Sequence, residues 1–427
     1  MAFQSMLSKG DLGLTHEDKK SFMESFLSKI SPRPKKILIL PPDFTRFNSA
    51  AGELSDIVYE LAGGYAQIDL MPALGTHFPM TETEIRKMFG DRIPLKSFLE
   101  HDWRKSLQKK GIVEKELIHD WSEGKVSYPV SIEVNKRLFD GYDLILSIGQ
   151  VVPHEVVGMA NYTKNICVGV GGQDTINKSH FLGAAYGMER IMGRTDTPVR
   201  KLFDYGVSNF LSELPIQYVL TVVGRNDDGS MAMRGIFGGN ERDAFVKAAE
   251  LSRRHNLTML DKPIKKCVVY LDPHEFKSTW LGNKSVYRTR MAMADGGELV
   301  VLAPGLREFG EDKEIDRLIR KYGYKGTPAT LDAVKKNKEL SDNLSAAAHL
   351  IHGSSEGRFS ITYCPGEGMS EKEIRSVGFE YCKFAEITKK YNPDKMKHGF
   401  NRMPGGEEIF FIGNPSIGLW TLKEKFC

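Results

Sequence analysis

The sequence contains little cysteine, no long apolar run and almost no charge bias. Its 427 residues include five widely spaced cysteines and no C-x-x-C pair, so neither a zinc ribbon nor a disulfide framework is indicated. No stretch approaches the ~18 consecutive apolar residues of a membrane span, and the first residues lack the apolar core of an export signal. The net charge of +4 is too small to indicate a nucleic-acid surface. We therefore expect a cytoplasmic protein that binds neither nucleic acid nor membrane.

Apolar runs alternate with helical patterns along the chain, as is typical of an α/β fold. Strands are predicted over residues 36–45, 67–77, 142–152, 165–172, 215–224, 266–273, 298–305, 359–364 and 407–415. Several of these runs are continuously apolar, as expected of strands covered on both faces. Helical spacing occupies residues 49–64, 81–90, 312–323 and 330–353, the second with a Thr-x-x-Glu capping start. We therefore predict two α/β domains, residues 1–260 and 261–427, and allow the last strand, about 407–420, to return to the first domain.

Polar side chains follow three of the predicted strands in the first domain. Asp43 and Arg46 follow the first strand, His77 the second and His154 the third. In open parallel sheets, ligands bind outside the carboxyl ends of the strands. These residues therefore predict a binding or catalytic site at that edge of the sheet.

A glycine-rich segment, GVGG (169–172), lies between Lys164 and His180. A glycine turn that leads into a helix can hold a phosphate with its backbone N–H groups, but GVGG also suits a plain tight turn. Lys164 fits either a solvated lysine at the edge of an apolar strand or a desolvated nucleophile. His180 alone fits a surface or capping histidine. Each feature is weak by itself, and the order in which they occur is the more informative observation.

That order resembles the nickel-pincer lactate racemase family. The resemblance is carried by DFTR (43–46), LGTH (74–77) and PHEVVGMANYTKNICVGVGG (153–172) followed by NKSH (177–180), and it covers about residues 40–185. It implies two α/β domains with an active-site cleft between them. It also implies a nickel-pincer nucleotide, Ni pyridinium-3,5-bisthiocarboxylic acid mononucleotide, as the cofactor. Cofactor-biosynthesis proteins would then be partners, and a recombinant sample from a host without them would lack the cofactor.

The resemblance assigns a role to each matching residue. Lys164 would attach the cofactor covalently through a thioamide, and His180 would be the protein ligand to nickel, a choice that suits square-planar Ni(II) with soft sulfur ligands. His77 and His154 would be the catalytic acid/base pair, since a neutral histidine with a pKa near ~6.5 suits transfer of a hydroxyl proton. The remaining residues would bind the cofactor, with Arg46 also contacting the substrate carboxylate; they are Asp43, Arg46, Gly169, Gly171 and Gly172.

The second domain departs from the family pattern where lactate racemase supplies a substrate-binding lysine. The comparable stretch, residues 272–297, offers Lys277, Trp280 and Lys284 as substrate-binding residues, and we favour Lys277 for the role of that lysine. Extra donors in this stretch favour a substrate larger than lactate. We therefore expect a racemase or epimerase that inverts C2 of a 2-hydroxy carboxylic acid, for example an aldonic acid such as gluconate, by reversible hydride transfer.

Two other functions use the same residues. A hydrolase or lyase could hold zinc or iron with His77, His154 and His180, because three histidines are chemically adequate ligands. A non-catalytic binding protein could keep the fold without the cofactor. The presence of Lys164 together with all three histidines argues against the second of these.

Overall fold

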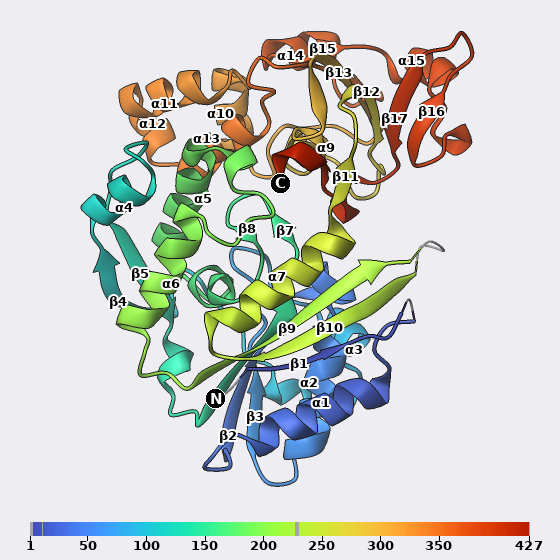
Figure 1. Cartoon of the computed structure of the whole chain (residues 1–427). Helices are drawn as coiled ribbons and strands as arrows, with labels where there is room; N and C mark the ends of the chain where they lie inside the picture. Colours follow the sequence, from blue (N-terminus) through green and yellow to red (C-terminus); the bar gives the residue numbers. More distant parts are fainter. Residues whose placement is uncertain (1–2, 11, 227–229, 427) are drawn as a thin grey trace. The chain divides into compact units, whose positions relative to one another are not determined.

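The computed structural model describes residues 3–10, 12–226 and 230–426, which form two compact units (Figure 1). The first unit comprises Met1–Leu182 and Arg190–Asn256, and the second comprises Gly183–Glu189 and Leu257–Cys427. The first unit ends at Asn256, whereas we expected the first domain to end at residue 260. The assignment of the short segment 183–189 to the second unit has no signal in the sequence.

The first unit is built on a six-stranded mixed sheet with the order β1-β10-β9-β6-β2-β3. Four of its strands run parallel, and they confirm the strands predicted at 36–45, 67–77, 142–152 and 215–224: β2 (Lys36–Leu40), β3 (Gln67–Leu70), β6 (Leu144–Gln150) and β9 (Ile216–Arg225). Two antiparallel strands, β10 (Met231–Gly239) and β1 (Gln4–Leu7), extend the sheet beyond β9. The strands β2 and β6 are buried almost throughout, which is why their sequences are apolar without alternation, whereas the edge strand β3 alternates between buried and less buried residues.

Helices cover this sheet and bury its apolar side chains. The core joins Phe22 and Phe26 of α1 (His16–Ser28) and Leu54 and Ile57 of α2 (Ala51–Ala62) to the central strands. The helix α3 (Glu82–Phe89) begins at the predicted capping box, in which Thr81 and Glu84 bond reciprocally. The other helices and strands of this unit are β4 (Leu107–Val113), α4 (Lys115–Trp121), β5 (Val130–Asn135), β7 (Pro153–His154), β8 (Gly158–Met159), α6 (Pro198–Phe210), α7 (Arg242–Asn256) and the part of α5 (Gln173–Tyr186) up to Leu182.

The prediction of a strand over residues 165–172 is wrong. Asn165–Gly169 form one turn of π-helix, and α5 follows after Gly172. Every residue from Asn165 to Gly172 is buried. A short apolar run that is buried on all sides has no periodicity, so a strand and a helical turn look alike in the sequence.

The second unit contains a six-stranded sheet with the order β15-β14-β13-β12-β17-β16. Four strands confirm the predicted ones: β12 (Ile264–Tyr270), β13 (Met293–Ala303), β14 (Ser360–Pro365) and β17 (Glu408–Ile412). The edges are β15 (Glu380–Tyr381), which is parallel, and β16 (Gly399–Arg402), which is antiparallel. A separate parallel pair joins β11 (Thr258–Leu260) to β18 (Trp420–Leu422).

Two expectations for this unit need correction. The strand β17 pairs in parallel with β12, so residues 407–420 do not return to the first domain. The helix expected over 330–353 is three helices, α11 (Thr327–Lys336), α12 (Lys338–Ser341) and α13 (Leu344–His352), because Asn337 and Asn343 leave the helical conformation and begin new helices. The remaining helices are α8 (Thr279–Gly282), α9 (Lys284–Thr289), α10 (Lys313–Tyr322), α14 (Glu371–Ser376) and α15 (Phe384–Lys390).

Over the residues that the structure describes, no helix combines the length and the apolar character that crossing a membrane requires.

We predict that Gly52→Ala destabilises the first unit. A Cβ atom at Gly52 would lie 1.9 Å from the carbonyl oxygen of Met88, so α2 and α3 would have to separate. We expect a loss of ~1–3 kcal/mol in the free energy of unfolding, measured by urea denaturation. Gly64→Ala is the matched control, since its Cβ would meet no atom within 4 Å. Equal stability of the two variants would contradict the packing described.

Candidate active site

The first element of the site is a buried carboxylate that holds a histidine. Asp43 follows β2 and accepts hydrogen bonds from the backbone N–H of Thr45 at 3.1 Å and from its hydroxyl at 2.5 Å. The Nδ1 atom of His77 lies 2.5 Å from Oδ2 of Asp43. The Asp43 side chain is 7% exposed and the His77 side chain 57%. Because the carboxylate accepts the proton of Nδ1, Nε2 of a neutral His77 is left as a proton acceptor.

The charge on Asp43 is stabilised in place. Burial by itself would raise the pKa of this carboxyl group, but the hydrogen bonds from His77 and Thr45 and the charge of Arg46 outweigh it and hold the pKa below its usual range. The turn that carries His77 is also fixed, since the backbone N–H of Gly75 donates to the carbonyl of Gly169 at 2.8 Å. The LGTH turn is thus tied to the segment that follows Lys164.

Lys164 directly precedes the π-helical turn and is partly buried. Burial is the main reason why its pKa is lowered from 10.5 to about 8, and the positive charge of Arg46 adds to the effect while Glu155 opposes it. An amine with this pKa is partly neutral, and therefore nucleophilic, near pH 8. The structure does not support the alternative that Lys164 is a solvated lysine at the edge of an apolar strand.

The other two histidines also form hydrogen bonds through Nδ1, which is the acceptor in His154 and the donor in His180. Nδ1 of His154 accepts from the backbone N–H of Val156 at 3.1 Å, so the proton of the neutral ring lies on Nε2. Nδ1 of His180 lies 2.6 Å from the carbonyl of Ile176 and donates to it, so its Nε2 has a free lone pair. Burial lowers the pKa of His154 well below its usual value and that of His180 to about 4, with the charge of Lys164 lowering both. Both rings are therefore neutral at neutral pH.

These residues act on one another electrostatically. The charges of Arg46, Glu155 and Lys164 all affect the pKa of His154, and Lys164 responds to Arg46 and Asp43. The candidate residues Asp43, Arg46, His77, His154, Lys164 and His180 all belong to the first unit. Asp43 and Arg46, His77 and His154 follow the carboxyl ends of β2, β3 and β6, the edge at which the sequence predicts a site. That all six residues serve one site stays a prediction.

Three residues with a place in this site were not predicted. Glu155 lies 3.8 Å from Nδ1 of His154 through its Oε2 atom. Asn165 donates from Nδ2 to the carbonyl of Leu40 at 3.0 Å and to the hydroxyl of Ser147 at 2.9 Å, which anchors the segment after Lys164 to β2 and β6. Arg200 on α6 contacts the segment before Lys164. None has a sequence signal beyond its residue type.

The three glycines of GVGG are explained by close packing. A Cβ atom would lie 2.7 Å from Cβ of Ala73 at Gly169, 1.8 Å from the carbonyl oxygen of Cys167 at Gly171, and 2.6 Å from Oε2 of Glu133 at Gly172. The space that the missing side chains leave is filled by protein atoms. A role of these glycines in binding the cofactor phosphate stays a prediction.

The candidate residues of the second unit are held within that unit. Lys277 is exposed, and its carbonyl accepts from the backbone N–H of Arg307 at 2.9 Å. The indole of Trp280 lies 4.4 Å from the ring of His349. Lys284 donates from Nζ to the hydroxyl of Ser416 at 3.2 Å and lies 4.0 Å from Glu275. Their contact with a substrate stays a prediction.

Fold and site together define an α/β protein of two units whose first unit gathers an activated lysine, three histidines, an arginine and carboxylates. Residues 21–190 match the family model described as the lactate racemase N-terminal domain. This match contains all of the first-unit candidate residues, so residues 21–190 are similar to the lactate racemase N-terminal domain.

Solved structures share the fold over nearly the whole chain. A protein from Thermotoga maritima has a TM-score of 0.77 at 23% sequence identity, with 97% of this chain and 99% of that chain covered. The lactate racemase apoprotein from Thermoanaerobacterium thermosaccharolyticum has a TM-score of 0.68 at 15% identity, with 94% and 92% covered. The curated proteins contain no match to the sequence. At these identities, the two structures establish the fold.

Within the described ranges, no three His, Cys, Asp or Glu side chains are arranged to share a metal ion. The hydrolase or lyase with zinc or iron on His77, His154 and His180 therefore finds no support in the arrangement of these side chains.

We predict that Lys164 reacts with acetic anhydride with a midpoint near pH 8, because its pKa is lowered to about 8. Ordinary lysines have a pKa near ~10.4 and titrate more than two units higher. Competitive labelling across pH 6–11, read by peptide mass spectrometry, measures the midpoint. Lys164→Arg removes the signal and confirms its assignment. A midpoint above about pH 10 would show an ordinary, hydrated amine.

Proposed function

We propose that the chain is an isomerase that inverts C2 of a 2-hydroxy carboxylic acid, with a nickel-pincer nucleotide attached to Lys164. The single observation that carries the proposal is the partly buried amine of Lys164, whose pKa is lowered to about 8, in one site with three neutral or carboxylate-bound histidines. The match of residues 21–190 to the lactate racemase N-terminal domain supports it. When bound, this cofactor supplies nickel and an electron-poor ring that accepts the C2 hydrogen with its electron pair and returns it.

The residues present fit such a group. Lys164 offers an amine that is neutral in part near pH 8, as formation of an amide-type bond requires. His180 offers Nε2 with a free lone pair, because its Nδ1 proton is held by the carbonyl of Ile176. The imidazole of His180 would be the protein ligand to the nickel ion, a nitrogen donor that suits Ni(II).

His77 and His154 provide the proton transfers on the substrate hydroxyl. His77 accepts a proton at Nε2, and the Asp43 carboxylate on its Nδ1 stabilises the imidazolium that results. The neutral His154 presents its proton on Nε2. The two histidines thus start from complementary states, one as acceptor and one as donor. Removal of the hydroxyl proton by one histidine would make the C2 hydrogen easier to lose with its electron pair to the bound cofactor, and the other histidine would return a proton to the same oxygen.

Arg46 is the substrate carboxylate contact in this proposal. Its guanidinium is exposed, next to Asp43, and its charge affects His154 and Lys164. Arginine binds carboxylates through two parallel hydrogen bonds. Lys277, Trp280 and Lys284 of the second unit would contact the rest of the substrate, and the donors in this stretch favour an acid larger than lactate, such as gluconate.

The proposed reaction predicts that the C2 hydrogen stays with the substrate. We expect protein expressed with the cofactor-making enzymes to convert one configuration of a C2-deuterated 2-hydroxy acid into the other with most of the deuterium retained, measured by NMR and mass spectrometry. A panel of lactate, malate, phenyllactate and gluconate identifies the substrate. Lys164→Ala should show no turnover.

Loss of the deuterium to solvent would show proton abstraction at C2 and contradict the hydride step. Turnover of lactate alone in the panel would contradict the larger substrate. Absence of turnover with every acid, in protein that carries the cofactor, would favour a non-catalytic relative.

We predict that Asp43→Asn lowers kcat by ~10²–10⁴-fold, the contribution of a positioned acid/base group. The substitution keeps the shape of Asp43 but removes the charge that stabilises protonated His77. Asp69→Asn is the matched control, because Asp69 on β3 accepts from the hydroxyl of Tyr142 and is not part of the site. Equal kcat in wild type and Asp43→Asn would remove His77 from the proton transfer.

A further inference from the structure

The backbone directly before Lys164 adopts a conformation that L-residues rarely take. Asn161 has φ 64° and Tyr162 has φ 59°, so two consecutive non-glycine residues lie in the left-handed region. Each such residue carries strain, which persists only where the surroundings over-determine the conformation, and strain of this kind concentrates at functional sites. The question is which contacts hold this turn.

The answer is the side chain of Arg200, which is 0% exposed. Its NH1 donates to the hydroxyl of Thr163 at 2.6 Å, and its NH2 donates to the carbonyls of Met159 at 2.7 Å and of Asn161 at 3.1 Å. The guanidinium lies 4.3 Å from the centre of the Phe245 ring. One rigid, planar group therefore fixes three successive points of the turn, which a lysine could not do.

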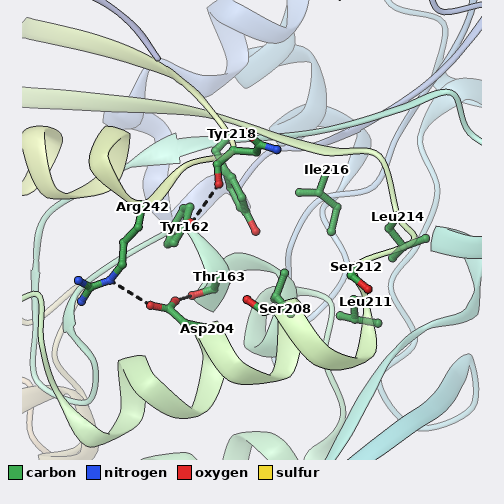
Figure 2. Close-up of a pocket in the computed structure, with 12 residues that line it drawn as sticks. Tyr162, Thr163, Asp204, Ser208, Leu211, Ser212, Leu214, Ile216, Tyr218 and Arg242 are labelled. Carbon is green, nitrogen blue, oxygen red and sulfur yellow. Dashed lines mark hydrogen bonds and ion pairs between the residues drawn. The ribbon is translucent and has the colours of Figure 1, made fainter. Parts of the chain in front are cut away.

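The charge of Arg200 is compensated by a carboxylate that water can reach. Asp204, one turn further along α6, lies 4.0 Å from NH1 and is 25% exposed. It accepts from the Thr163 hydroxyl at 2.6 Å and lies 3.3 Å from Nε of Arg242. Figure 2 shows Thr163, Asp204 and Arg242 along one side of a pocket of about 250 Å³. Thr163 thus links the buried cation to a hydrated anion, which makes burial of the guanidinium tolerable.

The same turn is held by aromatic packing. The ring of Tyr162 stacks on Phe245 with 5.2 Å between centroids and lies 4.4 Å from that of Tyr218. The Tyr162 hydroxyl donates to the carbonyl of Asn240 at 3.1 Å. On the other side of Lys164, Asn165 is anchored to Leu40 and Ser147. Lys164 is therefore the single residue between two anchored segments.

We infer that Arg200 is a positioning residue for Lys164: it locks the strained turn 159–163 so that the amine is held at the site and away from bulk water. The inference rests on the proposed function, because that function makes Lys164 the residue that attaches the cofactor. The experiment that tests the inference needs neither cofactor nor substrate. Besides Arg200, the charged or titratable groups that act on Lys164 or respond to it are Arg46, Glu155, Asp43, His154 and His180. These stay unchanged in the test.

The test measures the acetylation of Lys164 against pH in the full chain, in wild type, Arg200→Lys and Arg200→Met. We expect the midpoint to rise from about 8 by about one unit towards that of an ordinary lysine in both variants. In Arg200→Met the loss of the Arg200 charge, which itself lowers the pKa of Lys164, adds to the rise. Arg200→Lys keeps this charge, so a rise in that variant reports the freed turn that lets the amine reach water. Arg290→Lys is the matched control: Arg290 is 3% exposed and pairs with Glu189 and Glu356 in the second unit. In the Arg290→Lys variant, the midpoint for acetylation of Lys164 should equal that of wild type.

Thr163→Val keeps the test decisive if both Arg200 variants fail to fold. It removes one of the three contacts and the link to Asp204, so a smaller rise in the same direction is expected. A Lys164 midpoint that stays at the wild-type value while the melting temperature falls would show that Arg200 is merely structural, and would overturn the inference. A failure of the proposed isomerase activity leaves this labelling result intact, so the two failures are distinguishable.

Discussion

Desolvation of one amine is the constraint on which the site depends. Lys164 is partly withdrawn from water, and the positive charge of Arg46 adds to the effect of burial, so that its charged form is disfavoured. Water is kept away by the packing of the segment around it: Asn165 is bonded to the ends of β2 and β6, and the turn before Lys164 is bonded to Arg200. The sheet thus determines the chemistry of the lysine as well as its position.

The hydrogen bonds to the three histidines show a second constraint. In each ring, Nδ1 is engaged by Asp43, by the backbone N–H of Val156 or by the carbonyl of Ile176. These partners select the tautomer and leave Nε2 to act as a proton acceptor, a proton donor or a metal ligand respectively. Identical side chains therefore acquire three different capacities from their neighbours.

Much of the fold and part of the site could be predicted from the sequence. The strands β2 and β6 are apolar almost throughout because both faces are covered, and the polar residues after β2 and β3 mark the edge at which the site was predicted. Residues 165–172 were misassigned because a buried turn has the same composition as a buried strand. Arg200 was missed because its role depends on contacts with residues 37 to 41 positions away in the chain. Such contacts leave no local pattern.

The central claim, that Lys164 carries the cofactor, is tested most directly by peptide mass mapping with nickel analysis of the intact chain after expression with the cofactor-making enzymes. The account predicts one covalent adduct, on the peptide that contains Lys164, and about one nickel per adduct, as expected for a single square-planar site. An unmodified Lys164 peptide in a preparation that isomerises its substrate would contradict the account.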